Sequence, residues 1–414
     1  MSVSTESKLL SFTEARLLVE QHAATLSATE GERIDLLDAV GLVLAEDLRA
    51  DRDFPPFPRA TRDGYAVQAG DVESVPARLR CVGSIKAGAA VEESGITIGA
   101  GKAAEIMTGA PVPRGADAVV MVEYTEAADD EVTVKRSVKT GENVVPVGAE
   151  ARQGDVMVKR GTRVRHAMVA VAAAVGRAEV AVHRRPRVAV LATGDELVDV
   201  NLPPGPNEIR NSNSYSLAAQ VSDAGGEAML LPVARDDAGE LAILLHKGLD
   251  ANLLLLTGGV SMGKYDLVEE VLASLGGEFF FTGVAIQPGK PVVFGQVKLD
   301  GKTTPFFGLP GNPVSTMVTF QLFVRPVLNA LGGAKPEPLP FAKANLRAPF
   351  ATKTGLTRFL PARLDGTYEK PEVELIHWQG SGDLMAAVRS NCYIVVPPDR
   401  EKFEAGEAAT VLLS

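Results

Sequence analysis

The chain has 414 residues, and at roughly 100–200 residues per domain this length favours two to four domains over a single core. Hydrophobic residues make up 46% and charged residues 23%, which excludes a chain that is disordered throughout. The formal net charge of −10 argues against a broad nucleic-acid-binding face, but it is compatible with a local basic pocket for a small anion.

Cysteine usage and the lack of long apolar segments indicate the compartment. Cys81 and Cys392 lie far apart in the sequence and match neither a disulfide framework nor the spacing of a structural zinc site. The first residues contain glutamates and lack the basic region and apolar run of a signal peptide, and no stretch of about 18 uncharged apolar residues follows. We therefore expect a cytoplasmic protein that does not cross a membrane.

The first part of the chain begins with amphipathic patterns and then becomes rich in short strands. Ser11 is a suitable cap for a first helix, and residues 33–48 form a second amphipathic segment. Between residues 67 and 140, alternating apolar runs separated by Gly, Pro and Asp turns predict a small β domain inserted into the helical one. Residues 166–176 predict a compact helix, and HRRPR (183–187) marks a domain boundary.

From residue 187 onward, predicted strands alternate with predicted helices. The runs VAVLAT (188–193) and NLLLLT (252–257) are apolar throughout, as in strands that are buried on both faces, and residues 312–331 predict a long helix. This alternation predicts a parallel, three-layer α/β/α domain. AKPEPLP (334–340) is a linker, and the strands predicted after it form a small all-β domain.

Polar residues and glycines follow two of these predicted strands, at the sheet edge where open parallel sheets bind ligands. ATGDEL (192–197) places Asp195 and Glu196 there, and TGGVSMGKYD (257–266) follows another buried strand. The glycines let the backbone form an anion nest, to which the next helix adds its positive end, and this predicts a site for an anionic, phosphorylated small molecule. A plain turn whose glycines only satisfy positive φ is equally compatible with this loop taken alone.

Two stiff loops strengthen the prediction of a site. IQPGKPVVFG (286–295) holds Lys290 between two prolines, which suits a fixed contact to phosphate or another oxyanion, although alone it would be a surface lysine on a turn. GLPGNPVS (308–315) flanks Gly311 with Pro310 and Pro313, and the long helix starts at the second proline. Rigidity in neighbouring loops is typical of a preformed binding site.

The first half of the chain offers two further polar residues in tight turns, Asp63 in RDGYAV and Thr108 in MTGAPVP. Asp63 is as compatible with a metal-bridging carboxylate as with an ordinary Asx turn. The histidines lack flanking motifs, so no Ser/His/Asp triad can be assembled, and Cys392 is more typical of a buried filler than of a nucleophile.

Six strings occur in an order that resembles the MoeA family, the molybdopterin molybdenumtransferases, whose eukaryotic relatives are the gephyrin E domain and its plant counterpart. The strings are PPFPRATRDGYAV, AAEIMTGAPVPRGADAVVMVE, VAVLATGDEL, LLTGGVSMGKYD, QPGKPVVFG and GLPGNPVS. Each string alone is moderately specific, and in this order they are highly specific. The resemblance extends over nearly the whole chain, from the helix near residue 10 to the C-terminal strands.

The resemblance implies an α/β and β multidomain fold with four parts. These are an elongated N-terminal domain (8–52 with 143–185), an inserted β domain (53–142), a three-layer α/β/α molybdopterin-binding domain (186–333) and a C-terminal β barrel (336–414). It also implies that a homodimer inserts molybdate into adenylylated molybdopterin and releases AMP with the help of Mg2+. Other expected partners are the molybdopterin adenylyltransferase and molybdoenzyme chaperones. Binding to nucleic acid or to a membrane is not expected.

The same resemblance assigns roles to individual residues. The expected catalytic residues are Asp63, Thr108, Glu196, Asp266 and Lys290. The expected cofactor-binding residues are Gly258, Gly259, Ser261, Gly263, Pro310, Gly311, Pro313 and Ser381. The expected metal ligands are Asp266, Asp63 and Glu150.

The chain also departs from the family strings. Glu150 stands where Asp is usual, and Lys264 replaces the usual acid of the glycine turn. The arginines that usually precede Glu150 are replaced by Val145, Pro146 and Val147, and the lysine that usually precedes PGKP is replaced by Gln287. In the family string GRxEFxR, Leu356 stands in place of the first Arg and Arg358 in place of the acid. A member retuned for tungstate or for another pterin form is therefore an alternative.

Three further functions stay open. The chain is compatible with a molybdopterin or molybdate carrier that has lost turnover. A scaffold is a second alternative, although no receptor-binding signature is visible. The adenylylating partner enzyme shares the α/β domain, but the additional N-terminal, inserted and C-terminal domains argue against it.

Overall fold

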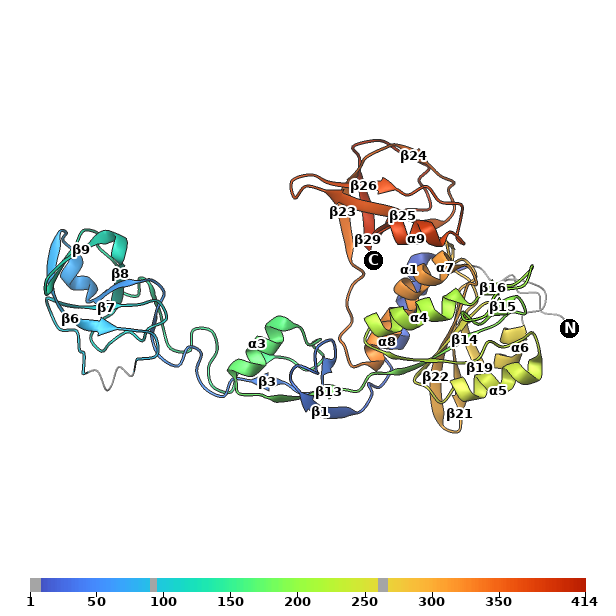
Figure 1. Cartoon of the computed structure of the whole chain (residues 1–414), viewed down its shortest axis with the longest axis horizontal. Coiled ribbons are helices and arrows are strands. Elements are labelled where there is room, and N and C mark those ends of the chain that lie inside the picture. The colour runs from blue at the N-terminus through green and yellow to red at the C-terminus, as the bar shows by residue number, and fades with distance from the viewer. Residues whose placement is uncertain (1–8, 90–94, 260–266) are drawn as a thin grey trace.

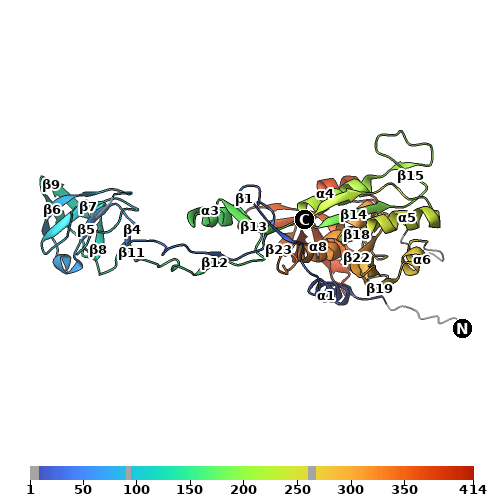
Figure 2. The ribbon, with the colours of Figure 1, turned by 90° about the horizontal axis from the view of Figure 1, so that it is seen from below.

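The computed structural model describes residues 9–89, 95–259 and 267–414. The molecule is elongated (Figures 1 and 2). A small β domain lies at one end, the α/β domain and a C-terminal barrel lie at the other, and a thin arm built around α3 joins them. This arrangement confirms the predicted multidomain fold class, whereas the exact domain bounds given above stay a prediction.

The arm is made from two separate stretches of sequence that pair with each other. β1 runs antiparallel to β13, which also pairs with β2, and a second small sheet joins β3 to β12. The amphipathic segment 33–48 therefore consists of short strands and turns that cover α3, not of a long helix. The elements are β1 (Gly31–Asp35), β2 (Val43–Leu44), β3 (Leu48–Arg49), β12 (Val156–Val158), α3 (His166–Ala174) and β13 (Glu179–His183).

The inserted β domain is a six-stranded sheet with the order β8-β5-β7-β6-β10-β9. Its alternating apolar residues fill two small cores, one of them around Tyr65 and Val120. A short ladder between β4 and β11 connects it to the arm. The strands are β4 (Arg59–Ala60), β5 (Gly64–Val67), β6 (Ala77–Ile85), β7 (Lys102–Ile106), β8 (Ala118–Met121), β9 (Thr125–Ala128), β10 (Glu131–Val134) and β11 (Val144–Val145), with 3-10 turns η1 (Ala69–Val72) and η2 (Val122–Tyr124).

The α/β domain has three layers. Its sheet has the order β17-β14-β18-β22-β21-β19, with α4, the helix from α7 to α8 and α1 on one face and α5 and α6 on the other. α1 begins with the predicted cap, since the Ser11 hydroxyl accepts from the Glu14 amide and Glu14 accepts from the Ser11 amide. The helices are α1 (Phe12–Ala23), α4 (Ser212–Asp223), α5 (Ala238–Gly248), α6 (Leu267–Ser274), α7 (Pro313–Thr319), the π turn η3 (Phe320–Val324) and α8 (Arg325–Leu331).

The sheet of this domain is mixed, so the prediction of a parallel sheet was wrong for two strand pairings. β17, β14, β18 and β22 are parallel, whereas β21 and β19 are antiparallel to their neighbours. A two-residue turn joins β21 to β22 through Asp300 (φ 50°) and Gly301 (φ 81°), and such a turn only connects antiparallel strands. The strands are β14 (Arg187–Ala192), β15 (Leu197–Val198), β16 (Ile209–Arg210), β17 (Glu227–Leu230), β18 (Leu253–Thr257), β19 (Gly277–Phe281), β21 (Val293–Leu299) and β22 (Lys302–Leu309).

The C-terminal domain is a closed barrel of β25, β26, β23, β29 and β27, because β25 also pairs with β27. A strand from the α/β stretch of the chain, β20, adds to this sheet beside β25. The elements are β20 (Ile286–Gln287), β23 (Phe341–Leu346), β24 (Phe350–Ala351), β25 (Thr357–Gly366), β26 (Pro371–Leu375), α9 (Leu384–Arg389), β27 (Cys392–Val396), β28 (Lys402–Phe403) and β29 (Ala408–Leu413).

Within the described part of the chain, one helix, Pro313–Leu331, is long and apolar enough to match a membrane span by length and composition alone. In this structure 67% of it is buried. Its apolar side chains, including Phe323 and Leu328, belong to the core between the sheet and α1. The same composition thus serves as the core helix of the α/β domain.

Candidate functional site

Three chain segments meet at the carboxyl edge of the α/β sheet. The Thr193 amide, directly after β14, donates to the Thr257 carbonyl over 3.0 Å, and Thr257 pairs in register with Leu309 of β22. Gly258 follows with a φ of +84°, and a Cβ there would lie only 2.3 Å from the Thr193 carbonyl oxygen. Only glycine therefore allows the chain to turn so close to β14.

An asparagine holds two of these segments together. The Asn213 side chain, in the first turn of α4, donates through Nδ2 to the Gly311 carbonyl over 2.7 Å and to the Thr257 hydroxyl over 3.0 Å. Gly311 also lies against the turn after β18, since a Cβ on it would be 3.6 Å from Gly258 Cα. The predicted glycines Gly258 and Gly311 are thus neighbours.

The proline loop links this edge to the C-terminal domain. The Pro310 carbonyl is buried and accepts from the Thr316 hydroxyl over 2.5 Å, and Pro313 is the first residue of α7. Ser381, on the loop before α9, accepts from Asn312 Nδ2 over 2.9 Å, and its carbonyl accepts from the Val314 amide over 2.9 Å. The structure therefore places the predicted residues Pro310, Pro313 and Ser381 close together.

Lys290 lies on a loop that packs on the same helix. Gly289 has a φ of +107°, and a Cβ there would lie 2.4 Å from Thr319 Cγ2 and 3.8 Å from the Ser315 carbonyl of α7. The Lys290 carbonyl accepts from the Val284 amide over 2.9 Å, and its side chain is exposed. The backbone of the loop is therefore fixed while the ammonium group faces solvent and any anion that enters.

Glu196 is exposed on the loop after β14, at the same edge of the sheet. Its carbonyl accepts from the Ile209 amide over 2.8 Å, within the short ladder of β15 and β16. Its carboxylate lies over Gly194, where a Cβ would be 2.4 Å from Oε2. The negative charge therefore lies near the end of β14.

The β domain holds a second group of predicted residues. Asp63 precedes β5 and Thr108 follows β7, and one carboxylate oxygen, Oδ1 of Asp63, accepts from both the Thr108 amide (2.6 Å) and its hydroxyl (2.8 Å). These two bonds, the backbone one first, hold the pKa of the Asp63 carboxyl below its ordinary value. Asp63 is thus an exposed, permanently ionised carboxylate at neutral pH.

The structure does not bring these two groups of residues together in one chain. Asp63 and Thr108 lie in the β domain, and the ends of β18 and β22 lie in the α/β domain at the opposite end of the molecule (Figures 1 and 2). Glu150, where the chain returns to the arm, forms an exposed ion pair with Arg59 over 3.1 Å. Ser261, Gly263, Lys264 and Asp266 lie outside the described residues.

Comparison with known proteins identifies the family. Residues 10–176 match the MoeA N-terminal region (domain I and II), residues 189–330 match a probable molybdopterin binding domain, and residues 343–414 match the MoeA C-terminal region (domain IV). A protein of Nostoc sp. named molybdopterin molybdenumtransferase is 35% identical, with 93% of this chain and 89% of that protein covered. The chain belongs to the MoeA family.

Other members and a solved structure support the assignment. The molybdopterin molybdenumtransferase of Bacillus subtilis is 34% identical over 93% of this chain and 90% of its own length. The crystal structure of the molybdopterin biosynthesis MoeA protein from Pyrococcus horikoshii is 30% identical, with a TM-score of 0.79 over 98% of this chain and all of that one. The MoeA resemblance seen in the sequence strings is thus confirmed.

The described residues contain no group of three or more His, Cys, Asp or Glu side chains that could hold a metal ion. Mg2+ commonly uses one or two carboxylates together with substrate phosphates and water, so it needs no such cage. The exposed, ionised Asp63 fits that kind of ligand set.

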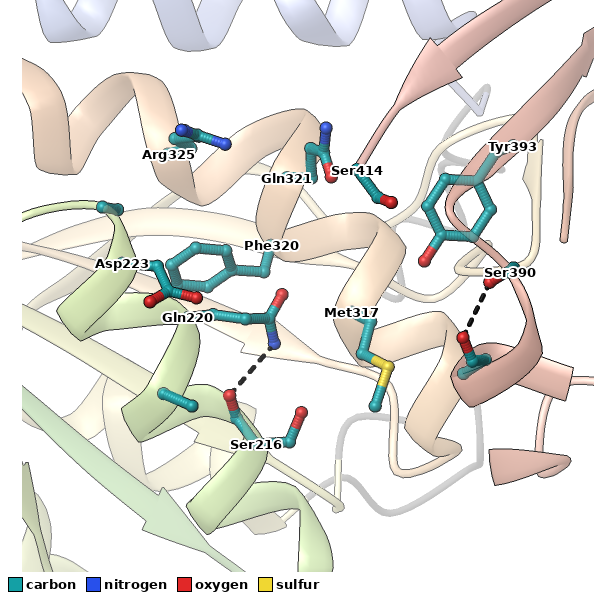
Figure 3. A pocket seen from close by; sticks show the side chains of 13 residues that line it. Ser216, Gln220, Asp223, Met317, Phe320, Gln321, Arg325, Ser390, Tyr393 and Ser414 are labelled. Carbon is teal, nitrogen blue, oxygen red and sulfur yellow. Dashed lines mark hydrogen bonds between the residues drawn. The ribbon is translucent and has the colours of Figure 1, made fainter. Parts of the chain in front are cut away.

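A cavity of about 320 Å3 lies elsewhere, between α4, the α7–α8 helix and the barrel (Figure 3). Its lining includes Gln220, Gln321 and Tyr393, and none of the predicted site residues. Burial raises the pKa of the Tyr393 hydroxyl to about 12, so it stays protonated. This cavity is separate from the carboxyl-edge site.

Sequence analysis missed the residues that hold the site together. Four residues form the hydrogen bonds that hold the strand ends together, and no motif had identified any of them as important. They are Thr193, Asn213, Thr257 and Asn312. One signal was available, since Thr193 and Thr257 are polar residues at the ends of otherwise apolar strands. Such a position marks the carboxyl edge of a parallel sheet.

Proposed function

We propose that this MoeA family member is a molybdopterin molybdenumtransferase that acts in the formation of the molybdenum cofactor. In the proposed reaction the two dithiolene sulfurs of adenylylated molybdopterin bond to molybdenum and displace oxygens of molybdate as water. Water cleaves the phosphoanhydride bond, AMP is released, and molybdenum keeps its oxidation state. The observation that carries the proposal is the meeting of Gly258, Gly311 and Ser381 at one sheet edge.

The residues of this edge have distinct tasks in the proposal. Because the glycines have no side chains, the protein backbone can contact the substrate there, and Lys290 supplies a positive charge for an oxyanion. When bound, Mg2+ neutralises the phosphoanhydride and favours the departure of AMP. Asp63, Asp266 and Glu150 are the carboxylates we propose as its ligands, and Thr108 holds Asp63 in place through two hydrogen bonds.

We also propose that the working unit is a homodimer in which the two halves of the site come from different chains. The support is the separation within one chain, where Asp63 and the carboxyl edge occupy opposite ends of the elongated molecule (Figure 1). A two-fold axis would place the β domain of each copy over the α/β edge of the other. The compartment we propose is the cytoplasm, in line with the two unpaired cysteines.

The decisive experiment supplies the purified protein with adenylylated molybdopterin, molybdate and Mg2+. We expect stoichiometric release of AMP and formation of a cofactor that reconstitutes a molybdoenzyme lacking it. Omission of Mg2+ should abolish AMP release. Tight binding of adenylylated molybdopterin without any AMP release would contradict the transferase and support the carrier.

A second candidate, an enzyme retuned for tungstate, follows from the altered string in the barrel, where Arg358 stands in place of the usual acid. Arg358 is only 7% exposed, its Nε donates to the Lys353 carbonyl over 2.9 Å, and burial lowers the pKa of its guanidinium. It pairs in register with Gln287 of β20, on the strand that leads to Lys290. Rates measured with molybdate and tungstate in parallel would separate the two candidates.

A further inference from the structure

Two buried oxygen atoms at the carboxyl edge have no hydrogen-bond partner in the described part of the chain. They are Thr193 Oγ1 and Asn213 Oδ1. Thr193 is 3% exposed and Asn213 is half-buried. Buried polar atoms in native proteins are almost always paired, and an unpaired one marks a place where a ligand, an ion or a water completes the structure.

The orientation of the Asn213 amide is fixed by its neighbours. Nδ2 lies 2.7 Å from the carbonyl oxygen of Gly311, and a carbonyl oxygen can only accept a hydrogen bond. If the amide were flipped, its oxygen would face the carbonyl oxygen of Gly311, and two acceptors would oppose each other. Oδ1 consequently points away from Gly311, and it offers lone pairs but no proton.

Thr193 Oγ1 lies directly beneath the glycine turn. A Cβ on Gly259 would be 2.5 Å from it, and a Cβ on Gly258 would be 3.4 Å from it. Gly259 and Gly311 are both exposed, and neither carries a side chain. The two unpaired oxygens thus lie close to glycines at the ends of β14, β18 and β22.

An acceptor such as Asn213 Oδ1 selects for N–H or O–H donors. Phosphate and molybdate at neutral pH present mainly oxygen acceptors, so they would leave it unpaired. We infer that Thr193 and Asn213 recognise the amino edge of a nitrogen heterocycle in the substrate, and that its anionic groups bind elsewhere, on the Lys290 side. This inference rests on the proposed function, because adenylylated molybdopterin carries two such heterocycles, a pterin and an adenine.

The test uses Thr193→Val in the full-length protein, because valine has the shape of threonine without the hydroxyl. Removal of a buried, unpaired hydroxyl should leave the melting temperature of the free protein unchanged or raise it by about 2 °C. The same change should weaken the binding of one heterocycle about five- to ten-fold, the effect of one lost hydrogen bond. A merely structural threonine would show the opposite stability change and no loss of affinity.

Thr304→Val is the matched control. Thr304 is also buried in the α/β domain, but its hydroxyl donates to the Leu249 carbonyl over 3.1 Å at the opposite end of β22. Its loss should lower the melting temperature and leave ligand affinity unchanged. The contrast between the two threonines separates an oxygen kept for a ligand from one used by the fold.

The probes are molybdopterin, which has a pterin and no adenine, and AMP, which has an adenine and no pterin. Loss of affinity for molybdopterin alone would identify the pterin as the donor, and loss for AMP alone would identify the adenine. Unchanged affinity for both probes in Thr193→Val, or no binding of either probe by the unaltered protein, would overturn the inference. A bound water would then be the partner of both oxygens.

Asn213 offers a second variant pair. Asn213→Asp keeps an acceptor but gives up the bond to Gly311, so it should lower the melting temperature more than it lowers affinity. Asn213→Leu should reduce both, and equal affinities in the two variants would contradict a role for Oδ1. Failure of the proposed function is distinguishable, because absent AMP release with intact probe binding would leave the heterocycle inference standing.

Discussion

The two ends of this molecule present polar groups in opposite states. In the β domain, Asp63 is exposed and its Oδ1 atom already accepts two hydrogen bonds from Thr108. At the carboxyl edge of the α/β domain, Thr193 Oγ1 and Asn213 Oδ1 are covered, and neither oxygen has a hydrogen-bond partner among the residues that the structure describes. The carboxylate of the first end is already hydrogen-bonded, whereas the two oxygens of the second end can still accept a hydrogen bond.

Because of this difference, the two ends are suited to different kinds of contact with a ligand. An exposed carboxylate with a lowered pKa is suited to meeting charge, such as a metal ion on a phosphoanhydride. A covered acceptor is suited to distinguishing one heterocycle edge from another, because an unmet hydrogen bond there weakens binding.

Asp63→Asn should lower AMP release on the order of a hundred-fold, the usual effect of removing one preorganised charge from a reaction site. Its melting temperature should barely change, since the side chain is exposed. Asp71→Asn is the matched control, because Asp71 is another carboxylate of this domain and accepts from the Gly101 amide over 2.8 Å. Full activity of Asp63→Asn would show that Asp63 does not belong to the site.

Mixing two inactive variants tests whether the ends meet across a dimer. Equal amounts of Asp63→Asn and Lys290→Ala, allowed to exchange subunits, should regain about a quarter of the normal AMP release, because half of the dimers would contain one intact site. Each variant alone should stay inactive. Absence of recovery after verified exchange would place both ends of the site in the same chain.

Arg163 tests how firmly the two ends are held relative to each other. Its guanidinium donates to the Gly41 carbonyl of the arm (2.7 Å), to the Ala224 carbonyl at the end of α4 (3.4 Å) and to Asn329 Oδ1 of α8 (3.0 Å). Arg163→Met should lower the free energy of unfolding by about 2 kcal/mol, because these acceptors lose their donor.

Spin labels in the β domain and the α/β domain should also give a broader distance distribution in Arg163→Met. Arg165→Met is the control, as Arg165 is exposed and its side chain makes no bond to the helix it precedes. A distribution as narrow as in the unaltered protein would show that other contacts fix the arm.

The Thr108 hydroxyl contributes to the lowered pKa of the Asp63 carboxyl. Because the folded-state pKa of Asp63 is lowered, the carboxylate persists until the pH falls through that pKa. Thr108→Val keeps the amide bond and loses the hydroxyl bond, so the pKa of Asp63 should rise toward its ordinary value. Titration of the Asp63 carboxyl by NMR measures this, and an unchanged pKa would assign the whole effect to the backbone.

The smallest effect is expected at Glu150. Its ion pair with Arg59 is exposed, so Glu150→Gln should change the free energy of unfolding by less than about 1 kcal/mol. The informative measurement is the Mg2+ concentration that gives half-maximal AMP release. A raised requirement would support Glu150 as a ligand, and an unchanged one would exclude it.

The sequence predicted those parts of the fold that depend on local pattern. The Ser11 cap, the apolar strand 253–257 and the start of the long helix at Pro313 are set by neighbouring residues, and the structure has all three. The antiparallel pair β21 and β22 was missed, because its turn at Asp300 and Gly301 carries less weight than the surrounding alternation of strands and helices. The pairing of arm strands depends on residues more than a hundred positions apart.

For the candidate site, the sequence pointed to the glycine and proline loops but not to what holds them. Asn213 contacts Gly311 across 98 positions of sequence, and no local pattern encodes such a contact. The distance between Asp63 and the sheet edge was likewise invisible, since it results from the length of the arm. The roles assigned to the site residues stay predictions.

The strand β20 has a consequence for how the C-terminal barrel can vary. It belongs by sequence to the α/β stretch, yet Ile286 and Gln287 pair with Thr357 and Arg358 of the barrel. The loop that carries Lys290 is therefore anchored on both domains at once. Rotating, replacing or deleting the barrel would also displace that lysine, so the two domains are constrained to evolve as a single unit.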